Sequence, residues 1–388
     1  MRVPLMVRGV AGWAAVCVSV IAASARPADT AQEATARMVR AADAFLSTLS
    51  EAQRQRVLFA FDDEKQRSNW SNLPTTFVPR GGINLKQMNA AQRSAAMALV
   101  ASALSKHGFE KVQQIMEGDE ILRSTDQGPR GNGTPPGPPP DGNSNRPPVP
   151  RGSNPPHSAS GPGRPTVGNG PMFGKDLYYI SILGTPSQNN PWMLQFGGHH
   201  LALNVTVAGD HGVLTPTLTG AQPALYTVEG KIVRPLGQES DKALALLNSL
   251  DEQHRKRAIL SYHLADLVLG PGQDGKTIVP EGLKASSMND RQRAMLLGLI
   301  SEWAGIIHES AATARMAELK ADLDDTWFAW SGPTTAVPGH NITAYYRIQG
   351  PHVVIEYAPQ TLGGDPSMHV HTMYRDPTND YGRRFWAN

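Results

Sequence analysis

The sequence predicts an α+β fold made of two internally duplicated halves, each with helices followed by antiparallel strands, packed about a pseudo-two-fold axis. Three observations predict it. Apolar residues recur at helical spacing over much of 35–122 and again from Ser240. The stretches 176–183 and 191–207 alternate in the manner of strands. Segments of the first half also return in the same order in the second half, which chance similarity between helices would not produce.

The internal repeat is clearest in two pairs of segments. Leu246–Arg257 matches Phe45–Arg56 at an offset of 201 residues. In the strand region, Phe196–Val205 (FGGHHLALNV) returns as Ile348–Tyr357 (IQGPHVVIEY) at an offset of 152. The offset falls because the second copy lacks a Pro/Gly-rich insertion. We therefore expect the two hairpins to occupy equivalent places in the two halves.

The chain begins with the three parts of a secretory signal peptide. Arg2 and Arg8 precede an apolar run that ends at Ala23, in a small-residue cleavage pattern, so we expect residues 1–25 to be removed. The run is shorter than the roughly 20 residues of a spanning helix. These features predict a secreted or periplasmic protein with no membrane span after signal removal. Cys17 is the only cysteine and leaves with the signal, so the mature chain has no disulfide and no thiolate ligand.

Composition divides the rest of the chain into four segments. Residues 26–125 carry the first-half helices. Residues 126–171 contain fourteen prolines and ten glycines, have almost no large apolar side chains, and are expected to be disordered. Residues 172–239 hold the first-half strands, and residues 240–388 hold the second half, helices and then strands. The individual helices expected in the first half are 35–50, 51–61, 89–106 and 109–122.

Histidines on predicted strands form the strongest candidate site. Residues two apart on a strand share a face, so His369 and His371 can converge on one cation. A third ligand must come from elsewhere, and His199 or His200 is the candidate. Neighbours on a strand face opposite ways, so only one of them joins, and the copied position His352 favours His200. The expected ion is a divalent transition metal, zinc or a redox metal. Alternatively, the histidines only hydrogen-bond in a polar interface, or they act as general acids or bases without a metal.

Three further residues are candidates for a catalytic role. Glu356 shares a strand face with His352 but lies about 13 Å along the strand, so it would have to meet His369 or His371 from a paired strand, as a ligand or general base. Arg80 or Arg375 would orient an anionic group of the substrate. For Arg80, surface salt bridging is the competing interpretation.

Several familiar functions are disfavoured by the sequence. Gly270–Thr277 matches the phosphate-binding loop pattern formally, but Pro280 and Gly282 fall where the helix of that motif should run. The sequence contains no Gly-x-Ser-x-Gly elbow. A net charge of +2, with no basic stripe interleaved with aromatics, argues against a nucleic-acid partner.

A set of short motifs occurs together along the chain. They are Trp70-x-Asn-Leu-Pro74, Arg80-Gly-Gly82, Gly184-x-Pro-Ser187, Gly198-His-His200, Gly350-Pro351, Ile355-Glu356, His369-x-His371, Arg375-Asp376 and Asp380-Tyr-Gly382. Together they resemble the DUF3500 family, whose function is unknown. The resemblance covers most of the mature chain apart from the insertion. It supports the choice of site residues without implying an activity.

Two functional hypotheses follow from the sequence. The first is an exported protein with a His-rich, metal-dependent catalytic site between the two halves, acting on an unknown small molecule. Zinc-type hydrolysis needs three protein ligands and an open position, which His200, His369 and His371 could provide. The second is a non-enzymatic extracytoplasmic binding or scaffold protein whose histidines are structural. Metal analysis separates the two.

Overall fold

The computed structural model of the protein describes residues 29–125, 172–362 and 364–385. The predicted signal peptide at 1–25 and the predicted disordered insertion at 126–171 therefore lie outside the described residues. Within the described part of the chain, no helix is long and apolar enough to cross a membrane. The fold is mixed α+β, which confirms the class predicted from the sequence.

The elements follow one another in the order helices, strands, helices, strands. The helices are α1 Ala31–Ser47, α2 Glu51–Val57, α3 Glu64–Arg67, α4 Ala90–Ala103, α5 Lys106–Thr125, α6 Gly237–Ser249, α7 Glu252–Ala258, α8 Asp290–Ala304 and α9 Glu309–Ala321. Short 3-10 helices are η1 Leu85–Gln87, η2 Ala285–Ser287, η3 Leu323–Asp325 and η4 Asp380–Phe385. The strands are β1 Leu58–Phe59, β2 Ile83–Asn84, β3 Tyr179–Leu183, β4 Trp192–Gly197, β5 Leu201–Ala208, β6 His211–Val213, β7 Thr217–Ala221, β8 Tyr226–Val228, β9 Lys231–Val233, β10 Leu283–Lys284, β11 Trp327–Ser331, β12 Tyr345–Gly350, β13 Val353–Pro359 and β14 Val370–Arg375.

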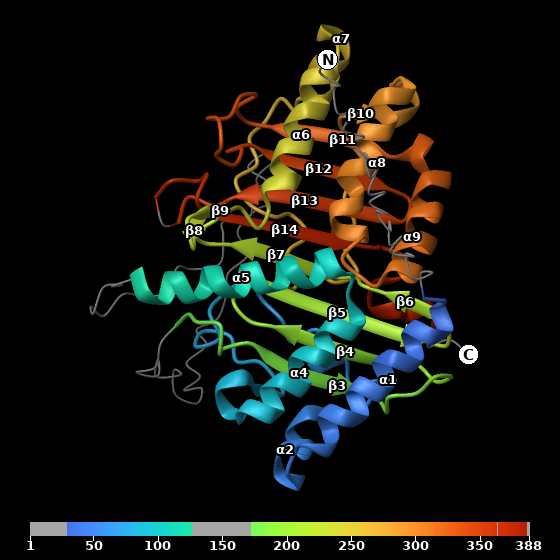
Figure 1. The fold of residues 1–388 in the computed structure, drawn as a ribbon. Helices are drawn as coiled ribbons and strands as arrows, with labels where there is room; N and C mark the ends of the chain where they lie inside the picture. Colours follow the sequence, from blue (N-terminus) through green and yellow to red (C-terminus); the bar gives the residue numbers. More distant parts are fainter. Residues whose placement is uncertain (1–28, 126–171, 363, 386–388) are drawn as a thin grey trace, which may run out of the picture.

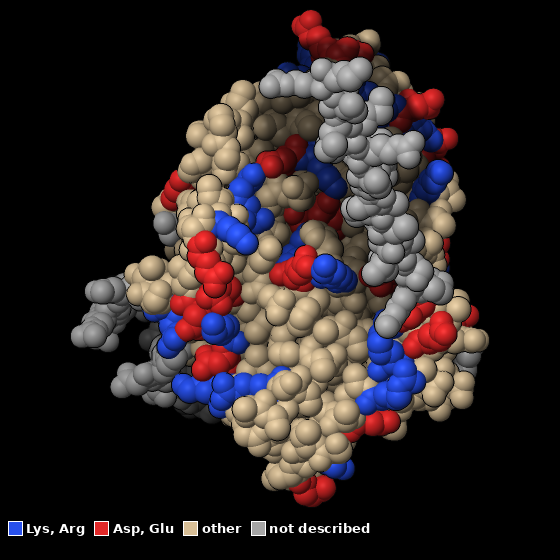
Figure 2. Space-filling model, in the orientation of Figure 1, with Lys and Arg blue, Asp and Glu red and all other residues tan. Residues whose placement is uncertain are grey.

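One long sheet runs through the whole protein, in the order β1-β3-β4-β5-β7-β14-β13-β12-β11-β10. All of its strand pairs are antiparallel except β1 with β3. The central pair is β7 with β14, the last sheet strand of each half, with Thr219 opposite Thr372 and their hydroxyls 2.6 Å apart. Helices of both halves lie together on one face of the sheet (Figure 1). Acidic and basic side chains are mixed over this face (Figure 2).

The long helices α4 and α8 begin in the same way in the two halves. The Asn89 side chain accepts from Gln92 N at 2.9 Å while Gln92 Oε1 accepts from Asn89 N, and Asn289 with Gln292 repeats this capping box. Reciprocal bonds of this kind satisfy amides that a helix start otherwise leaves free. Each glutamine also donates to a carbonyl at the end of the preceding long helix, at 2.9 and 2.8 Å.

The sequence placed two helix boundaries wrongly. The helix expected over 51–61 ends at Val57, because Leu58 and Phe59 pair with β3 as strand β1. The helix expected to start at residue 109 starts at Lys106, because the Ser105 hydroxyl accepts from Gly108 N at 2.9 Å and caps it. Hydrogen bonds made by the fold, rather than apolar spacing, set both boundaries.

The helices of the first half contact those of the second half through the links that follow α4 and α8. Ser105 N donates to Ile306 O at 3.0 Å, and His308 N donates to Ala103 O at 3.1 Å. Ser105 caps α5 and His308 caps α9, so residues in matching positions exchange these bonds. An antiparallel bridge joins Leu104 to Ile307 between them.

The apolar core lies between the sheet and the helices. Along β5, Leu201, Leu203 and Val205 pack into it, while Ala202 and Asn204 point to the opposite face. The loops at 60–82 and 262–282 contact that opposite face, through hydrogen bonds from the former to β3 and β4 and from the latter to β13. A polar site can therefore form under the loops without interrupting the core.

Candidate metal centre

His199 and His200 occupy the tip of the hairpin between β4 and β5. A hydrogen bond from Gly198 N to Leu201 O, 2.8 Å long, closes the turn around them. Gly220 N, from β7, donates to His200 O at 2.7 Å and holds the turn against the central strands. The sequence Gly-His-His thus follows the end of β4 and places both imidazoles at the end of the hairpin, next to the central strand β7.

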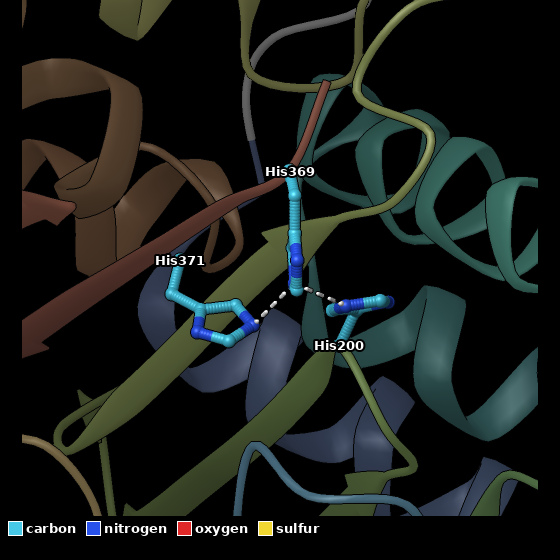
Figure 3. A group of neighbouring side chains, drawn as sticks. All are labelled: His200, His369 and His371. Carbon is cyan, nitrogen blue, oxygen red and sulfur yellow. Dashed lines mark hydrogen bonds between the residues drawn. The ribbon is translucent and has the colours of Figure 1, made fainter. Parts of the chain in front are cut away.

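His369 and His371 reach the same place from β14. His371 lies opposite Gly220 in the sheet, and His369 directly precedes the strand. The intervening register points Thr372 toward the helices, where its hydroxyl accepts from Trp303 Nε1 at 2.9 Å. His371 therefore points away from the helices that pack on β14. Figure 3 shows its imidazole in front of the strands, next to those of His200 and His369.

Three imidazoles converge through their Nε2 atoms. His200 Nε2 and His369 Nε2 are 3.3 Å apart, and His369 Nε2 and His371 Nε2 are 3.1 Å apart (Figure 3). All three side chains are buried, and their nitrogens lie within 4.8 Å of one another. Gly220 makes room for two of the rings, because a Cβ there would lie 2.9 Å from His371 Cδ2 and 3.0 Å from His200 Cδ2.

Hydrogen bonds on the other ring nitrogens fix the tautomers of two of these histidines. His200 Nδ1 lies 2.6 Å from Asp119 Oδ1, and His369 Nδ1 lies 2.8 Å from the carbonyl oxygen of Leu362. Neither oxygen can donate, so both Nδ1 atoms carry the proton. The Nε2 atoms of His200 and His369 therefore present lone pairs to each other across 3.3 Å.

The third imidazole is less constrained. Asn72 Nδ2 lies 3.2 Å from His371 Nδ1. With this amide donating, His371 carries its proton on Nε2 and can donate to His369 Nε2. With the amide turned over, Asn72 would instead accept from Nδ1 and leave all three Nε2 lone pairs free. Nothing in either arrangement supplies a donor to His200 Nε2.

Burial keeps these histidines neutral near pH 7. It lowers the pKa of His200 to about 4, with a further contribution from His199, and lowers the pKa of His369 to about 4, with His200 contributing next. The pKa of His371 falls well below its usual value, again chiefly through burial and then through His369. At neutral pH, therefore, protonation of His200 or His369 does not relieve the repulsion between their facing Nε2 lone pairs.

Asp119 of α5 supports the site from behind. Burial alone would raise its pKa, but His200 and His199 outweigh that effect, so the pKa of Asp119 lies well below its usual value. Its second oxygen accepts from the Tyr178 hydroxyl at 2.7 Å. The ionised carboxylate thus orients His200 while it is itself fixed.

His199 lies beside the three converging imidazoles without joining them. Its ring packs against His200, with centroids 3.7 Å apart, and against Phe173, with centroids 4.9 Å apart. Its Nδ1 is buried, lies 3.7 Å from Asp119 Oδ1, and has no hydrogen-bond partner among the residues that the structure describes. Asp119, His199 and His200 make a second group whose ligand atoms could surround an ion. In that group, however, the contact between His200 and Asp119 is already a donor–acceptor pair.

Glu356 is held away from this cluster by its own partners. The strand register sets it opposite Met373, whereas His371 is opposite Ala358. Its two oxygens accept from the amides of Val268 and Leu269, both at 2.8 Å, and from the Tyr345 hydroxyl at 2.7 Å. Burial raises its pKa in spite of these bonds. Its observed contacts attach the 262–282 loop to the sheet.

Arg375 is likewise fully engaged. It donates to the carbonyls of Leu269 and Gly270, and to the carboxylates of Asp274 at 2.9 Å and Asp380 at 2.8 Å. The pKa of Arg375 is raised because those carboxylates outweigh the effect of its burial. These contacts also fix the glycine-rich segment that resembled a phosphate-binding loop.

Arg80 lies next to the Gly-His-His turn. Its guanidinium donates to Gly198 O at 3.2 Å and to the carbonyls of Ser71 and Leu73, both at 2.8 Å, and it also contacts the carbonyl of Val78. Burial lowers its pKa to about 10. Of the residues predicted from the sequence, the structure therefore brings together His200, His369 and His371, with His199 and Arg80 adjacent.

Four residues of the site were missed by sequence reasoning: Asp119, Tyr178, Asn72 and Gly220. Asp119 sits in an ordinary helical pattern, and Asn72 sits within a turn motif, so neither carries a local signal of its role. Gly220 is an isolated glycine in a strand, which often marks a close approach. That signal alone could have been used.

Comparison with known proteins places this architecture in a family. The family model described as a protein of unknown function (DUF3500) matches residues 31–383. The chain belongs to the DUF3500 family. No curated protein and no solved structure matches it at a significant level. The DUF3500 assignment agrees with the motif resemblance and leaves the activity to be argued from the site.

Proposed function

We propose that this DUF3500 protein binds one divalent transition metal ion through His200, His369 and His371, and uses it in catalysis. One observation carries the proposal. The lone pairs of His200 Nε2 and His369 Nε2 face each other across 3.3 Å, and the hydrogen bonds on the two Nδ1 atoms prevent either ring from turning a proton inward. A cation between them converts this repulsion into attraction.

The spacing fits such an ion. Metal–nitrogen bonds of about 2.0–2.1 Å at tetrahedral angles place two ligand atoms about 3.3–3.4 Å apart. The two measured separations are 3.3 and 3.1 Å. Structural zinc sites use four protein ligands, whereas catalytic sites use three and keep one position open. Three histidines therefore support a catalytic centre. A bound ion there would supply Lewis acidity for hydrolysis or, if redox-active, electron transfer.

The surrounding residues have supporting roles in this proposal. Asp119 and the Leu362 carbonyl hold the imidazoles of His200 and His369 with Nε2 inward, as outer partners of metal-bound histidines do. Asn72 holds His371, with its amide oxygen toward Nδ1 in the loaded site. We give Glu356 and Arg375 no part in the chemistry, since their polar atoms are used in holding loops.

The duplication and the export of the chain are part of the same proposal. Matching capping boxes on α4 and α8, and the matching bonds from Ser105 N to Ile306 O and from His308 N to Ala103 O, support an origin from one repeated unit. Residues 1–25 have the composition of a signal peptide, which supports a secreted or periplasmic location. Sequencing the N-terminus of protein recovered from the periplasm or medium tests the second point, and a retained Met1 would contradict it.

The second candidate function is non-enzymatic binding or scaffolding, with the histidines serving only structure. The observation in its favour is that His371 can donate to His369 while Asn72 donates to His371, which satisfies two of the three rings without an ion. This arrangement still leaves His200 Nε2 without a donor.

Metal analysis separates the two candidates. Protein purified without a His tag, stripped with chelator and reloaded with Zn²⁺, Cu²⁺, Fe²⁺ or Ni²⁺ should retain close to one equivalent of at least one metal after gel filtration. Less than about 0.2 equivalents of every metal would contradict the proposal. Two equivalents, one of them lost on His199→Ala substitution, would show that the group of Asp119, His199 and His200 also holds an ion.

A further inference from the structure

A small cavity lies under the 60–82 loop, beside the Gly-His-His turn. It is a pocket open to solvent, and about 310 Å³ of space, open solvent included, lies within it against strands β3, β4 and β5. Its loop side is formed by Gln66, Asn69, Trp70 and Arg80, and its sheet side includes Gln195 and Asn204. Gly197 and Leu201, the residues on either side of the turn, also line it. The lining residue Leu201 directly follows His200, and Gly197 precedes His199 by two positions.

The polar groups on the sheet side satisfy one another. Gln195 Oε1 accepts from Gln66 Nε2 at 3.0 Å and from the Ser181 hydroxyl at 3.1 Å. Gln195 Nε2 donates to Asn204 Oδ1 at 2.9 Å, and Asn204 Nδ2 donates to the carbonyl of Pro216 at 2.7 Å. This wall is polar and neutral, and its shape is fixed by the network.

Arg80 is the charged group of the cavity, and its charge is not matched. Within the described residues its hydrogen bonds go only to backbone carbonyls, which carry no net charge. Arg375 shows the opposite case, since two carboxylates neutralise it. A largely buried cation without a counter-charge costs stability unless an anion completes it. The cavity therefore offers a monoanion a guanidinium.

The position of this charge relates it to the candidate metal centre. Arg80 Nη2 donates to Gly198 O at 3.2 Å, so it holds the residue that begins the histidine turn. The pKa of His199 is lowered chiefly by burial, and the positive charge of Arg80 contributes to this shift. A ligand group beside Arg80 would therefore lie next to the turn that carries His200.

We propose that this cavity binds the carboxylate group of a small polar substrate, with Arg80 as its anchor. One guanidinium among neutral amides suits a single negative charge better than the double charge of phosphate, since the lining residues include no second cation. The amides and Trp70 would contact the uncharged remainder of the molecule. That the ligand is a substrate rests on the proposed metal-dependent function, whereas its binding does not.

The test uses metal-free protein and simple anions. Acetate and propionate, titrated at constant ionic strength with chloride as the balancing ion, should bind with millimolar affinity by calorimetry, while acetamide should not bind. Arg80→Lys should weaken binding about tenfold and Arg80→Met should abolish it. Arg56→Met is the matched control. In the described part of the chain Arg56 also donates only to neutral groups, Gly82 O and Gln87 Oε1, but it is exposed and outside the cavity.

A second measurement covers the case in which Arg80→Met fails to fold. The Nε–H resonance of Arg80, assigned by its absence in Arg80→Lys, should shift on titration of wild-type protein with propionate. No shift, or equal shifts at Arg56, would overturn the inference. Stronger binding of phosphate than of propionate would overturn the carboxylate assignment. Because the protein is metal-free throughout, propionate binding can succeed where metal retention fails, and the reverse, so the two proposals are tested separately.

Discussion

The hairpin turn at His200 and the turn at His352 are built alike, yet only one faces a set of converging ligands. Both close through a glycine at the start of the turn, Gly198 or Gly350, and both histidines face an aspartate. Asp119 lies within α5, whereas Asp322 lies at the end of α9. His200 Nδ1 is 2.6 Å from Asp119, and His352 Nε2 is 3.7 Å from Asp322. The first pair is buried, whereas about a third of each side chain of the second is exposed.

The difference comes from what the neighbouring chain offers. Beside His200, β14 brings in two further imidazoles. Beside His352, the neighbours are the Thr378 hydroxyl at 2.9 Å and the guanidinium of Arg384 at 3.4 Å. A hydroxyl and a cation cannot replace imidazole ligands. The comparison teaches that the turn alone supplies one candidate ligand and its carboxylate, while the convergence of three imidazoles depends on the neighbouring strand.

The largest expected effect comes from removing one of the candidate metal ligands. His371→Ala should lower metal affinity by about 100-fold or more, because the loss of one of three ligands removes a large share of the binding free energy. His352→Ala should leave both affinity and stoichiometry unchanged. Competition with a coloured chelator measures both, and equal losses in the two variants would disprove the assigned site.

A second substitution tests the space for the rings without removing a ligand. The Cβ of Gly220→Ala would press on both His371 and His200, so metal affinity should fall about 10- to 100-fold and stability by about 1–3 kcal/mol. Gly298→Ala is the control, since it lies in α8 with open space around it and should stabilise by about 0.5–1 kcal/mol. Unchanged metal affinity in Gly220→Ala would mean that the rings are not fixed where the structure has them.

The aspartates give a third, smaller contrast. Asp119→Asn should weaken metal binding about 10-fold, within the range found for outer partners of metal-bound histidines, because the neutral amide raises the basicity of His200 less. Asp322→Asn should change neither metal binding nor stability by more than about 0.5 kcal/mol, since its contact is exposed. Metal titrations and urea unfolding of the two variants check this, and a response of similar size in both would remove the distinction between the turns.

The smallest expected effect concerns His308, which caps the start of α9 as Ser105 caps the start of α5. Burial lowers the pKa of His308 to about 4, from about 6.5 in the unfolded chain. Both states are uncharged there above pH 6.5. Below it, the unfolded chain binds a proton at this residue that the folded protein does not. His308 by itself therefore lowers the free energy of unfolding by about 1 kcal/mol between pH 7 and 5.5, in addition to the contributions of the buried histidines of the candidate site.

His308→Ser, which gives α9 the kind of cap that Ser105 gives α5, should remove this one-proton slope. Urea unfolding of metal-free protein at several pH values measures it. An unchanged slope in His308→Ser would assign the missing proton to another group.

The sequence was sufficient for the parts of the site that depend on local spacing. Alternation along a strand placed His369 and His371 on one face, and the repeat singled out His200 over His199. The helical pattern likewise located α4, although this helix ends at Ala103 rather than at residue 106. These features are encoded within a few residues of one another.

Other parts of the site could not be predicted because they depend on how distant elements pack. Asp119 meets His200 only because α5 crosses the end of the hairpin, and Asn72 meets His371 only because its loop folds over the sheet. Glu356 and Arg375 were candidates by residue type, but the 262–282 loop, which is distant in sequence, supplies most of their partners. Its amides bind Glu356 across 87 and 88 positions, and its Leu269 carbonyl accepts from Arg375 across 106 positions. Residue type alone does not reveal such partners.

The contact between His200 and His369 joins positions 169 residues apart. Contacts between positions so distant in the chain form slowly, and the pairing of β7 with β14 is what brings these two histidines together. In the proposed metal-bound form, the ion would therefore bind only once these strands have paired. Binding of the ion would then be the last step of maturation, and the metal–ligand bonds would crosslink the hairpin that carries His200 to β14. Chelation should accordingly speed unfolding much more than it slows folding.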